Sequence, residues 1–177
     1  MSYQQEELPN SKDINTETKR PNSLTVLLVL SAIYIVMSLS ATFQAISNGP
    51  LTQNQLEQET SEFYGSMVEL RNQGLGEELT DMAEVMVETS VYINNEVYQL
   101  TNYLRLIELI IGAASLVLMF QLKKIGFHIY LFYSLFPIIT TYITLPQELI
   151  LTASIVVMVF IGALFALLYG TKLKYMK

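Results

Sequence analysis

Arg105 and Glu108 stand inside a long apolar stretch of this chain, and they are the residues best placed to do chemistry. On a helix, a spacing of three residues brings both side chains to one face, one turn apart. A carboxylate inside a membrane is costly unless it is paired or functional, so Glu108 could bind a proton or a cation. The two could instead form an ion pair near the lipid headgroups. We favour the ion pair, because a single acidic residue near one face of the membrane is poorly suited to relaying protons or cations across the whole bilayer.

His128 is the only histidine, and it follows Lys124 by one helical turn. Because histidine titrates near neutral pH, it could act as a switch, although a lone histidine among aromatic residues is more often simply packed and hydrogen-bonded. We favour the packed histidine. The neighbouring aromatic residues could line a groove for a lipid or hydrophobic ligand, or could anchor and pack a helix at the membrane interface, which we favour. They are Tyr130, Phe132, Tyr133, Phe136 and Tyr142.

The chain offers few side chains for metal binding or covalent catalysis, because it has no cysteine and one histidine. The acidic stripe Glu77, Asp81, Glu84 and Glu88 matches no calcium-loop spacing, so we interpret it as a solvated face. The net charge of −6 argues against a nucleic-acid partner. We therefore expect no cofactor, no metal and no enzymatic activity.

Four long apolar stretches hold most of these residues. Each is about 20 residues long, the length that a helix needs to cross a hydrocarbon core of about 30 Å. The mean hydropathy of +0.38 fits a membrane protein. The sequence predicts an all-α membrane protein with four transmembrane helices, at residues 23–47, 103–122, 125–145 and 149–170.

The charges between these stretches predict an orientation. The segment 51–100 contains ten acidic residues and one basic residue, Arg71. Seven further basic residues flank the opposite ends of the spans: Lys19, Arg20, Lys123, Lys124, Lys172, Lys174 and Lys177. Since lysine and arginine mark the cytoplasmic side, we expect a disordered tail at 1–22 and a basic tail at 171–177 in the cytoplasm. The first apolar run is too long for a signal peptide, so we expect it to be retained as an anchor.

The segment 48–102 predicts an extracytoplasmic helical hairpin. Apolar residues repeat every three or four positions through 52–72 and again from residue 77, with a glycine-containing break between them. The second repeat reaches the second span without proline or glycine. We therefore expect one helix over about 77–122, roughly 70 Å long. Its outer half would pair antiparallel with the 52–72 helix, giving a hairpin that stands above the membrane. The expected seam of the hairpin is Phe63, Met67, Met82, Met86 and Ile93.

Two further features concern how the spans pack. Pro137 should kink the third span, because proline removes one backbone hydrogen bond. Gly162, Ala166 and Gly170 form a strip of small residues on the fourth span, which would let another helix approach closely.

Three segments at the membrane edges, 20–27, 122–130 and 168–174, resemble a family of small four-helix membrane proteins of unknown function that is widespread in Bacteroidetes. They read RPNSLTVL, LKKIGFHIY and LYGTKLK. The resemblance implies a bacterial inner membrane and the same topology. It implies no activity and transfers no site residue.

Three functions can be weighed against these features. We favour an accessory protein that presents the periplasmic hairpin to a protein partner or to another copy of itself. The alternative is a small oligomeric transporter or channel that uses Arg105, Glu108 and the Pro137-kinked span, although such proteins usually have more intramembrane ionisable residues and two similar halves. An intramembrane enzyme would need paired catalytic groups that are not present at usable spacing.

Overall fold

The computed structural model describes residues 21–72, 74 and 77–177, and these residues are almost entirely helical. The long helices, in chain order, are α1 (Asn22–Asn48), α2 (Gln53–Asn72), α3 (Glu77–Tyr92), α4 (Tyr98–Phe120), α5 (Lys124–Thr144) and α6 (Thr152–Gly170). Three short turns complete the order: a π-helical turn η1 (Ile93–Val97) and two 3₁₀ turns, η2 (Gln147–Leu149) and η3 (Leu173–Tyr175). The expected tail 1–22 lies almost wholly outside the described residues.

Four helical segments are long and apolar enough to cross a membrane: Asn22–Asn48, Thr80–Phe120, Lys124–Thr144 and Thr152–Tyr175. This arrangement is that of a multi-pass membrane protein, and each segment contains most of one expected span. The fourth span begins later than expected. Pro146 is followed by the 3₁₀ turn η2, so α6 begins at Thr152 rather than at residue 149.

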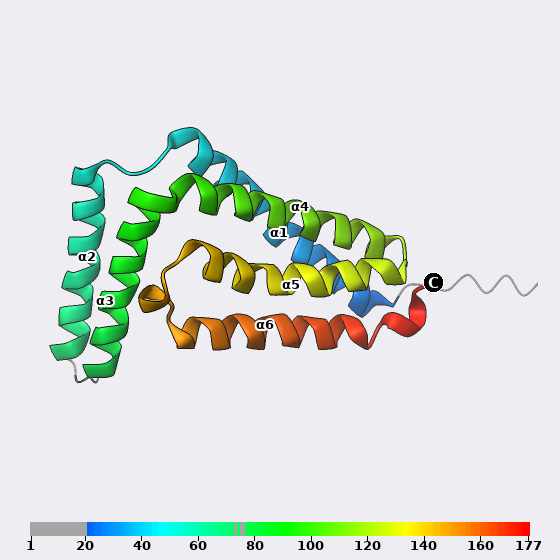
Figure 1. Cartoon of the computed structure of the whole chain (residues 1–177). Helices are drawn as coiled ribbons and strands as arrows, with labels where there is room; N and C mark the ends of the chain where they lie inside the picture. The colour runs from blue at the N-terminus through cyan, green and yellow to red at the C-terminus, as the bar shows by residue number, and fades with distance from the viewer. Residues whose placement is uncertain (1–20, 73, 75–76) are drawn as a thin grey trace, which may run out of the picture.

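The four spanning helices form a bundle in which α4 and α5 are central (Figure 1). Helix α1 packs on α4, and α6 packs on α5. The most deeply buried side chains are Leu24, Leu109, Met119 and Tyr169. Three of these lie towards the end of the bundle where α1 begins and α6 ends, so the core is tightest at that end.

The seam between α4 and α5 depends on two glycines. A Cβ atom at Gly126 would lie 2.6 Å from the backbone nitrogen of Met119 and 2.8 Å from the backbone oxygen of Ser115. A Cβ at Gly112 would lie 2.7 Å from the ring of Tyr133. The backbones of α4 and α5 therefore approach more closely than any other residue type would allow at Gly126.

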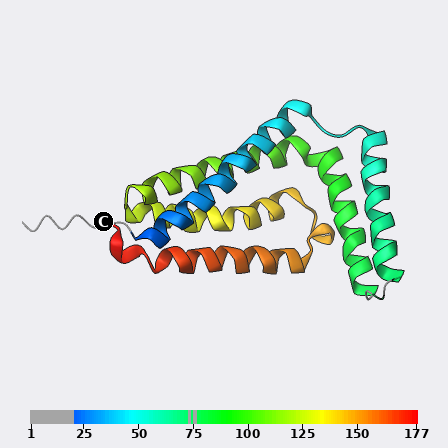
Figure 2. The same ribbon diagram turned by 180° about the vertical axis from the view of Figure 1, so that it is seen from behind.

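The second span does continue the helix of the hairpin, but its axis is not straight. The helical backbone passes from α3 through η1 into α4 without a break. At η1 the axis turns, and α3 crosses the end of the bundle while α2 lies on the far side of α3 (Figures 1 and 2). Val97, with φ −126° and ψ 16°, departs from helical geometry at this turn. The expected hairpin was to stand above the membrane, whereas in the structure α3 lies across the end of the bundle.

Tertiary hydrogen bonds explain the turn. Asn94 is buried, and its side chain accepts from the Leu51 N–H at 2.7 Å and donates to the Leu51 carbonyl at 3.1 Å. The Tyr98 hydroxyl donates to the Ala45 carbonyl at 2.8 Å, at the end of α1. Earlier in the chain, within α3, the Thr89 hydroxyl donates to the Leu149 carbonyl at 3.2 Å, which links α3 to η2. These bonds hold α3 across the bundle.

The seam between α2 and α3 differs from the expected one. The buried apolar residues are Leu56, Ala83 and Val87, whereas Met86 is 49% exposed. The other expected seam residues, Phe63, Met67, Met82 and Ile93, are half-buried. Because α3 also contacts η2, its buried stripe is set by two neighbours instead of one. The stripe therefore lies one position along from the methionines.

Candidate functional site

A groove lies between α1 and α6 in the described part of the chain. Viewed from behind, α1 runs diagonally away from α6 towards the hairpin, and α5 is visible between them (Figure 2). The groove has a volume of about 490 Å³, and α1, α4, α5 and α6 all contribute to its lining. Most of the lining is apolar or aromatic, including Leu30, Ile35, Ile161 and Phe165.

Arg105 and Glu108 form the polar part of the groove. An Arg105 guanidinium nitrogen lies 2.6 Å from a Glu108 carboxylate oxygen, so the residues make the i,i+3 ion pair that their spacing predicts. The second terminal nitrogen of Arg105 donates to the Tyr34 hydroxyl of α1 at 2.6 Å. The Glu108 side chain is only 3% exposed, whereas that of Arg105 is 33% exposed. A molecule in the groove would therefore meet the guanidinium before the carboxylate.

Tyr169 joins α1 to α6 next to the lining residues Ser31 and Tyr130, at the end of the groove towards the C-terminus of α6. Its side chain is fully buried, and its hydroxyl donates to the Leu27 carbonyl at 3.1 Å. The Ser31 hydroxyl lies 2.8 Å from the same oxygen. The ring of Tyr169 also packs on Tyr130, with 4.8 Å between the centroids. This network joins α1, α5 and α6 at one end, while the other ends of α1 and α6 diverge.

The α5 wall contains Pro137 and several of the aromatic residues singled out from the sequence. Tyr130, Tyr133 and Pro137 line the groove, but Phe132 and Tyr142 are exposed away from it. Helix α5 continues through Pro137 to Thr144. The Thr141 hydroxyl bonds the Pro137 carbonyl at 2.9 Å. The aromatic set thus divides between groove lining and surface positions.

The strip of small residues on α6 faces inward. A Cβ at Gly162 would meet Ser134 of α5 at 3.4 Å, and one at Gly170 would meet the Phe127 ring at 3.7 Å. Between them, Ala166 is half-buried. Gly162 and Gly170 thus serve the approach of α5 within this chain, so the strip gives no support for contact with a second chain.

His128 lies outside the groove, on the exposed side of α5. Its Nδ1 is 3.0 Å from the Lys124 carbonyl, and its ring meets Phe127 edge-on at 6.0 Å. The side chain is therefore hydrogen-bonded as expected but is exposed rather than packed inside the bundle, and its role as a switch stays a prediction. Within the described residues there is no group of three or more histidine or acidic side chains that could hold a metal ion.

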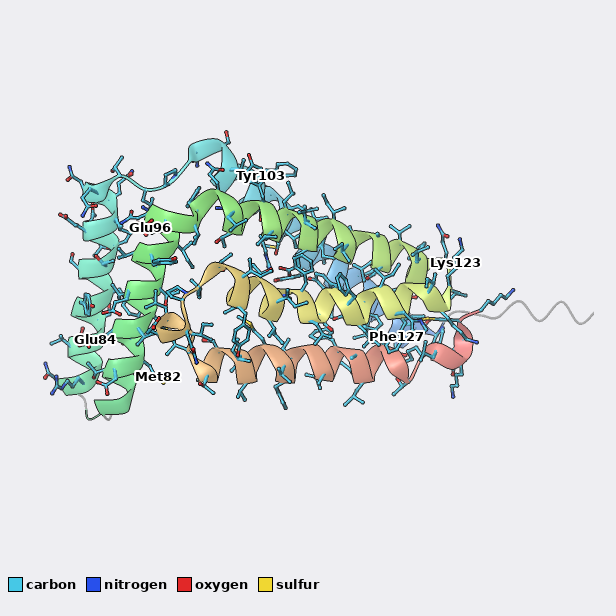
Figure 3. The ribbon with its side chains drawn as sticks, viewed as in Figure 1. Met82, Glu84, Glu96, Tyr103, Lys123 and Phe127 are labelled. Atoms are coloured by element: carbon cyan, nitrogen blue, oxygen red, sulfur yellow. The ribbon has the colours of Figure 1, made fainter. Side chains whose placement is uncertain are left out.

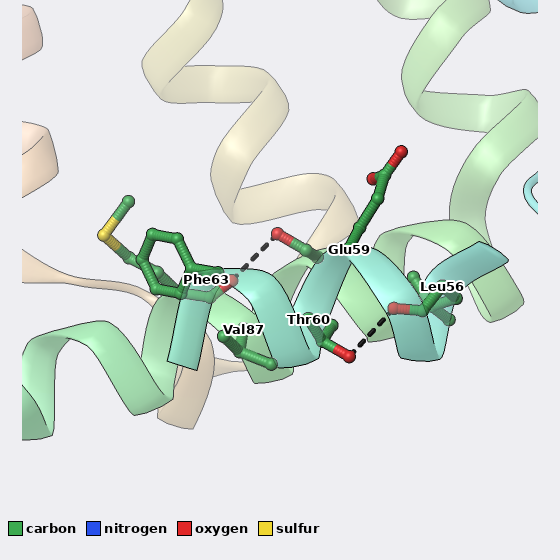
Figure 4. Close-up of a pocket in the computed structure, with 7 residues that line it drawn as sticks. Leu56, Glu59, Thr60, Phe63 and Val87 are labelled. Carbon is green, nitrogen blue, oxygen red and sulfur yellow. Dashed lines mark hydrogen bonds between the residues drawn. The ribbon is translucent and has the colours of Figure 1, made fainter. Parts of the chain in front are cut away.

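A second, smaller hollow of about 190 Å³ lies in the hairpin between α2 and α3 (Figure 4). It is lined by Leu56, Glu59, Thr60, Phe63, Met86, Val87 and Ser90. The Thr60 hydroxyl bonds the Leu56 carbonyl at 2.8 Å and so is turned back onto its own helix. The hairpin seam is therefore less completely filled than the α4–α5 seam.

Charges separate to the two ends of the molecule (Figure 3). Glu84 and Glu96 lie at the hairpin end, and Lys123 lies at the opposite end. Near Lys123, the chain end returns to the α4–α5 turn, where the Lys177 N–H donates to the Leu122 carbonyl and the Lys124 N–H donates to the Lys177 carbonyl. The basic residues at 123–124 and 172–177 thus share one end with the start of α1.

Sequence reasoning missed three important residues. Tyr34 completes the polar part of the groove from 71 positions away, and a tyrosine within the first apolar stretch was its only signal. Tyr169 had been noticed only as part of an edge segment. Asn94 carries no signal in the sequence beyond its polarity, whereas the structure shows that it is buried and hydrogen-bonded to Leu51, as buried polar side chains usually are.

Comparison with known proteins identifies no relative: no family model, curated protein or solved structure matches this chain. The resemblance to the Bacteroidetes family therefore remains an expectation based on three short segments. The function has to be argued from the geometry.

Proposed function

We propose that this chain is an inner-membrane interaction protein that presents its α2–α3 hairpin to a protein partner on the extracytoplasmic side. The supporting observation is the position of α2, which lies beyond α3 from the bundle and has one side uncovered (Figures 1 and 2). On α2, Tyr64 is 40% exposed and Val68 is 56% exposed, one turn apart. Exposed apolar residues on a water-facing helix are candidates for an interface.

The charge distribution supports the proposed orientation. The basic residues gather at the end where α1 begins, and the acidic residues gather at the hairpin end. By the positive-inside rule, the first end is cytoplasmic and the hairpin is outside. The membrane anchor then holds the hairpin across the outer end of the bundle, so that α2 faces the extracytoplasmic space.

The same charges favour a foreign partner over a second copy. The segment 51–100 has a net charge of −9, from ten acidic residues and Arg71. Two such hairpins brought together would place like charges against each other, which costs free energy at an interface. A partner with a basic surface around an apolar patch would complement this hairpin.

The transporter alternative is supported by the Arg105–Glu108 pair, which lines the groove between α1 and α6. However, Tyr169 closes that groove towards the end of the bundle that we place in the cytoplasm. A groove with one closed end is better suited to holding a molecule than to passing one. We therefore rank the transporter below the interaction protein.

Orientation can be tested first, because the chain contains no cysteine and a single introduced thiol is unambiguous. We expect a membrane-impermeant thiol reagent on intact cells to label Ser66→Cys in α2 but to leave Lys174→Cys unlabelled. Lysed cells should show labelling of both. Labelling of Lys174→Cys alone in intact cells would reverse the topology and overturn the proposal.

The partner can then be tested by gentle solubilisation of the tagged full chain and mass measurement of the complex. We expect a stoichiometric foreign subunit that is lost in Tyr64→Ser/Val68→Ser. The matched control is Asn54→Ser/Gln58→Ser, which changes two exposed polar residues at the same spacing on α2. A complex that contains only copies of this chain, or loss of the partner in both variants, would contradict the proposed α2 interface.

A further inference from the structure

We propose that the groove between α1 and α6 binds one anionic amphiphile, with its acidic head group on Arg105 and Tyr34 and its hydrocarbon chain along the aromatic wall of α5. This is independent of the proposed role of the hairpin. The ligand class is defined by its chemistry: a carboxylate or phosphate head group joined to an apolar chain. A fatty acid and an acidic phospholipid both meet this description.

The size and lining of the groove fit such a molecule. Small-molecule sites have volumes of roughly 300–1,000 Å³, are mostly apolar, and contain a few polar groups that fix orientation. This groove has about 490 Å³, apolar walls and one polar cluster. A groove for a whole partner helix would not need a charged pair in its wall, whereas a ligand with a polar head does.

The difference in exposure within the ion pair selects an anion over a cation. Both residues line the groove, but Glu108 is only 3% exposed, while a third of the Arg105 side chain is accessible. A guanidinium has five N–H donors in a planar fork, and only two are used by Glu108 and Tyr34. The remaining donors can bind a carboxylate or phosphate in the two-bonded geometry that arginine favours.

Tyr34 adds a second donor for the head group. Its hydroxyl oxygen already accepts a hydrogen bond from Arg105, so its own proton is available to an acceptor in the groove. The hydroxyl and the guanidinium come from α1 and α4. An anion between them would therefore join the helix that diverges to the one at the centre of the bundle.

The position of the polar cluster suits an amphiphile in the outer leaflet. Arg105 lies seven residues inside the start of α4 at Tyr98, which is about 10 Å along the helix. The apolar lining extends from there along α5 towards Tyr130. Beyond the lining residues Ser31 and Tyr130, Tyr169 joins α1 to α6, so the helices come together where the chain of the ligand would end.

The chain contains no tryptophan, which allows a direct test. Phe165→Trp places a single indole in the groove, and Leu167→Trp places one on α6 at a position that is 70% exposed and outside the groove lining. Each full-length variant is reconstituted into nanodiscs of a neutral phospholipid. Increasing fractions of a lipid with a brominated chain, which quenches tryptophan on contact, are then added.

Three brominated probes separate the outcomes: a phosphatidylcholine, a phosphatidic acid and a fatty acid. We expect half-quenching of Phe165→Trp at about a tenfold lower fraction of an acidic probe than of phosphatidylcholine, the factor expected for one hydrogen bond to a charged group. Leu167→Trp should show no preference. The more effective acidic probe identifies whether the head group is a phosphate or a carboxylate. Equal quenching of Phe165→Trp by all three probes would overturn the proposal.

The head-group residues are tested in the Phe165→Trp background. Tyr34→Phe keeps the ring and removes only the hydroxyl, while Arg105→Gln/Glu108→Gln removes both charges together. Both changes should reduce the preference for acidic probes, and Tyr142→Phe, at a position 62% exposed, should not. Circular dichroism and the elution profile verify folding. A preference retained in the two well-folded variants would contradict the assignment of the head group.

Discussion

The two sides of the bundle differ in how closely their helices meet. Between α4 and α5, Gly126 lets one backbone contact the other, and a Cβ at this position would meet backbone atoms of Met119 and Ser115. Between α1 and α6 there is a groove of about 490 Å³, closed only where Tyr169 bonds Ser31 and Leu27. The chain connects α4 to α5 through the short turn 121–123, whereas α1 and α6 are the first and last spans.

This difference indicates a division of labour. A seam without space provides rigidity, because helices in lipid associate through close packing and hydrogen bonds. A groove reduces the contact area between two helices, so it persists only if neighbouring elements hold the helices apart or a molecule fills the space. Arg105 and Glu108 belong to α4, so the rigid seam positions the polar groups of the open groove.

The largest effect should come from separating the charged pair. Arg105→Gln would leave the Glu108 carboxylate buried without its cation, which typically costs about 3–5 kcal/mol. We expect the thermal unfolding midpoint in detergent to fall by roughly 10 °C, given about 2–4 °C per kcal/mol for a protein of this size. The double variant Arg105→Gln/Glu108→Gln should recover much of the loss. If the double variant is as unstable as the single one, the pair does not act as a unit.

Gly126→Ala should break the seam with the next largest effect. Its Cβ would meet the Met119 backbone at 2.6 Å, and backbone atoms cannot move aside as a flexible side chain can. Overpacking of this kind costs about 1–3 kcal/mol, measured as a lower unfolding midpoint. Gly162→Ala is the control, since its Cβ would lie 3.4 Å from Ser134. Equal destabilisation by both variants would show that the α4–α5 seam is not specially tight.

Gly112→Ala should affect both the α4–α5 seam and the groove, because Gly112 lies in the seam and contacts Tyr133, which lines the groove. Its Cβ would meet the Tyr133 ring, which can rotate, so the loss of stability should be about 1 kcal/mol, below that of Gly126→Ala. Tyr133 also lines the groove, and its movement should weaken quenching of Phe165→Trp by acidic brominated lipid. A stability loss larger than that of Gly126→Ala would reverse the proposed order.

An effect no larger than that of Gly112→Ala should come from the end of the groove where Tyr169 joins α1 to α6. Tyr169→Phe removes the hydroxyl that joins α6 to Ser31 and Leu27, at a cost of about 1 kcal/mol. We expect the unfolding midpoint to fall by roughly 2–4 °C. Tyr142→Phe changes an exposed hydroxyl and should leave the midpoint unchanged. If Tyr169→Phe also leaves the unfolding midpoint unchanged, packing of the residue 169 ring, without its hydroxyl, is enough to hold α1 and α6 together at this end.

The sequence predicted well what depends on neighbours along the chain. The apolar runs located the four spans to within a few residues at most ends, because span length and hydropathy are local properties. The Arg105–Glu108 contact also followed from spacing on one helix. Neither prediction required knowledge of which helices are adjacent.

What depends on distant neighbours could not be predicted. Tyr34 reaches Arg105 only because α1 packs on α4, and Gly126 is indispensable only because α5 packs on α4 at that position. The turn of α3 across the bundle has the same origin. Residues 77–111 contain no proline or glycine that would signal this turn. The turn depends instead on the hydrogen bond between Asn94 and Leu51, which are 43 positions apart.

The π-helical turn Ile93–Val97 has one more consequence. A π turn closes its hydrogen bonds one residue later than an α turn, so it is equivalent to a single inserted residue in an otherwise regular helix. With 3.6 residues per turn, one residue changes the angular phase between the two flanking segments by about 100°. Insertion or loss of one residue here would therefore reassign which face of α3 meets the bundle and which face is offered outward, without altering a single residue of the membrane spans.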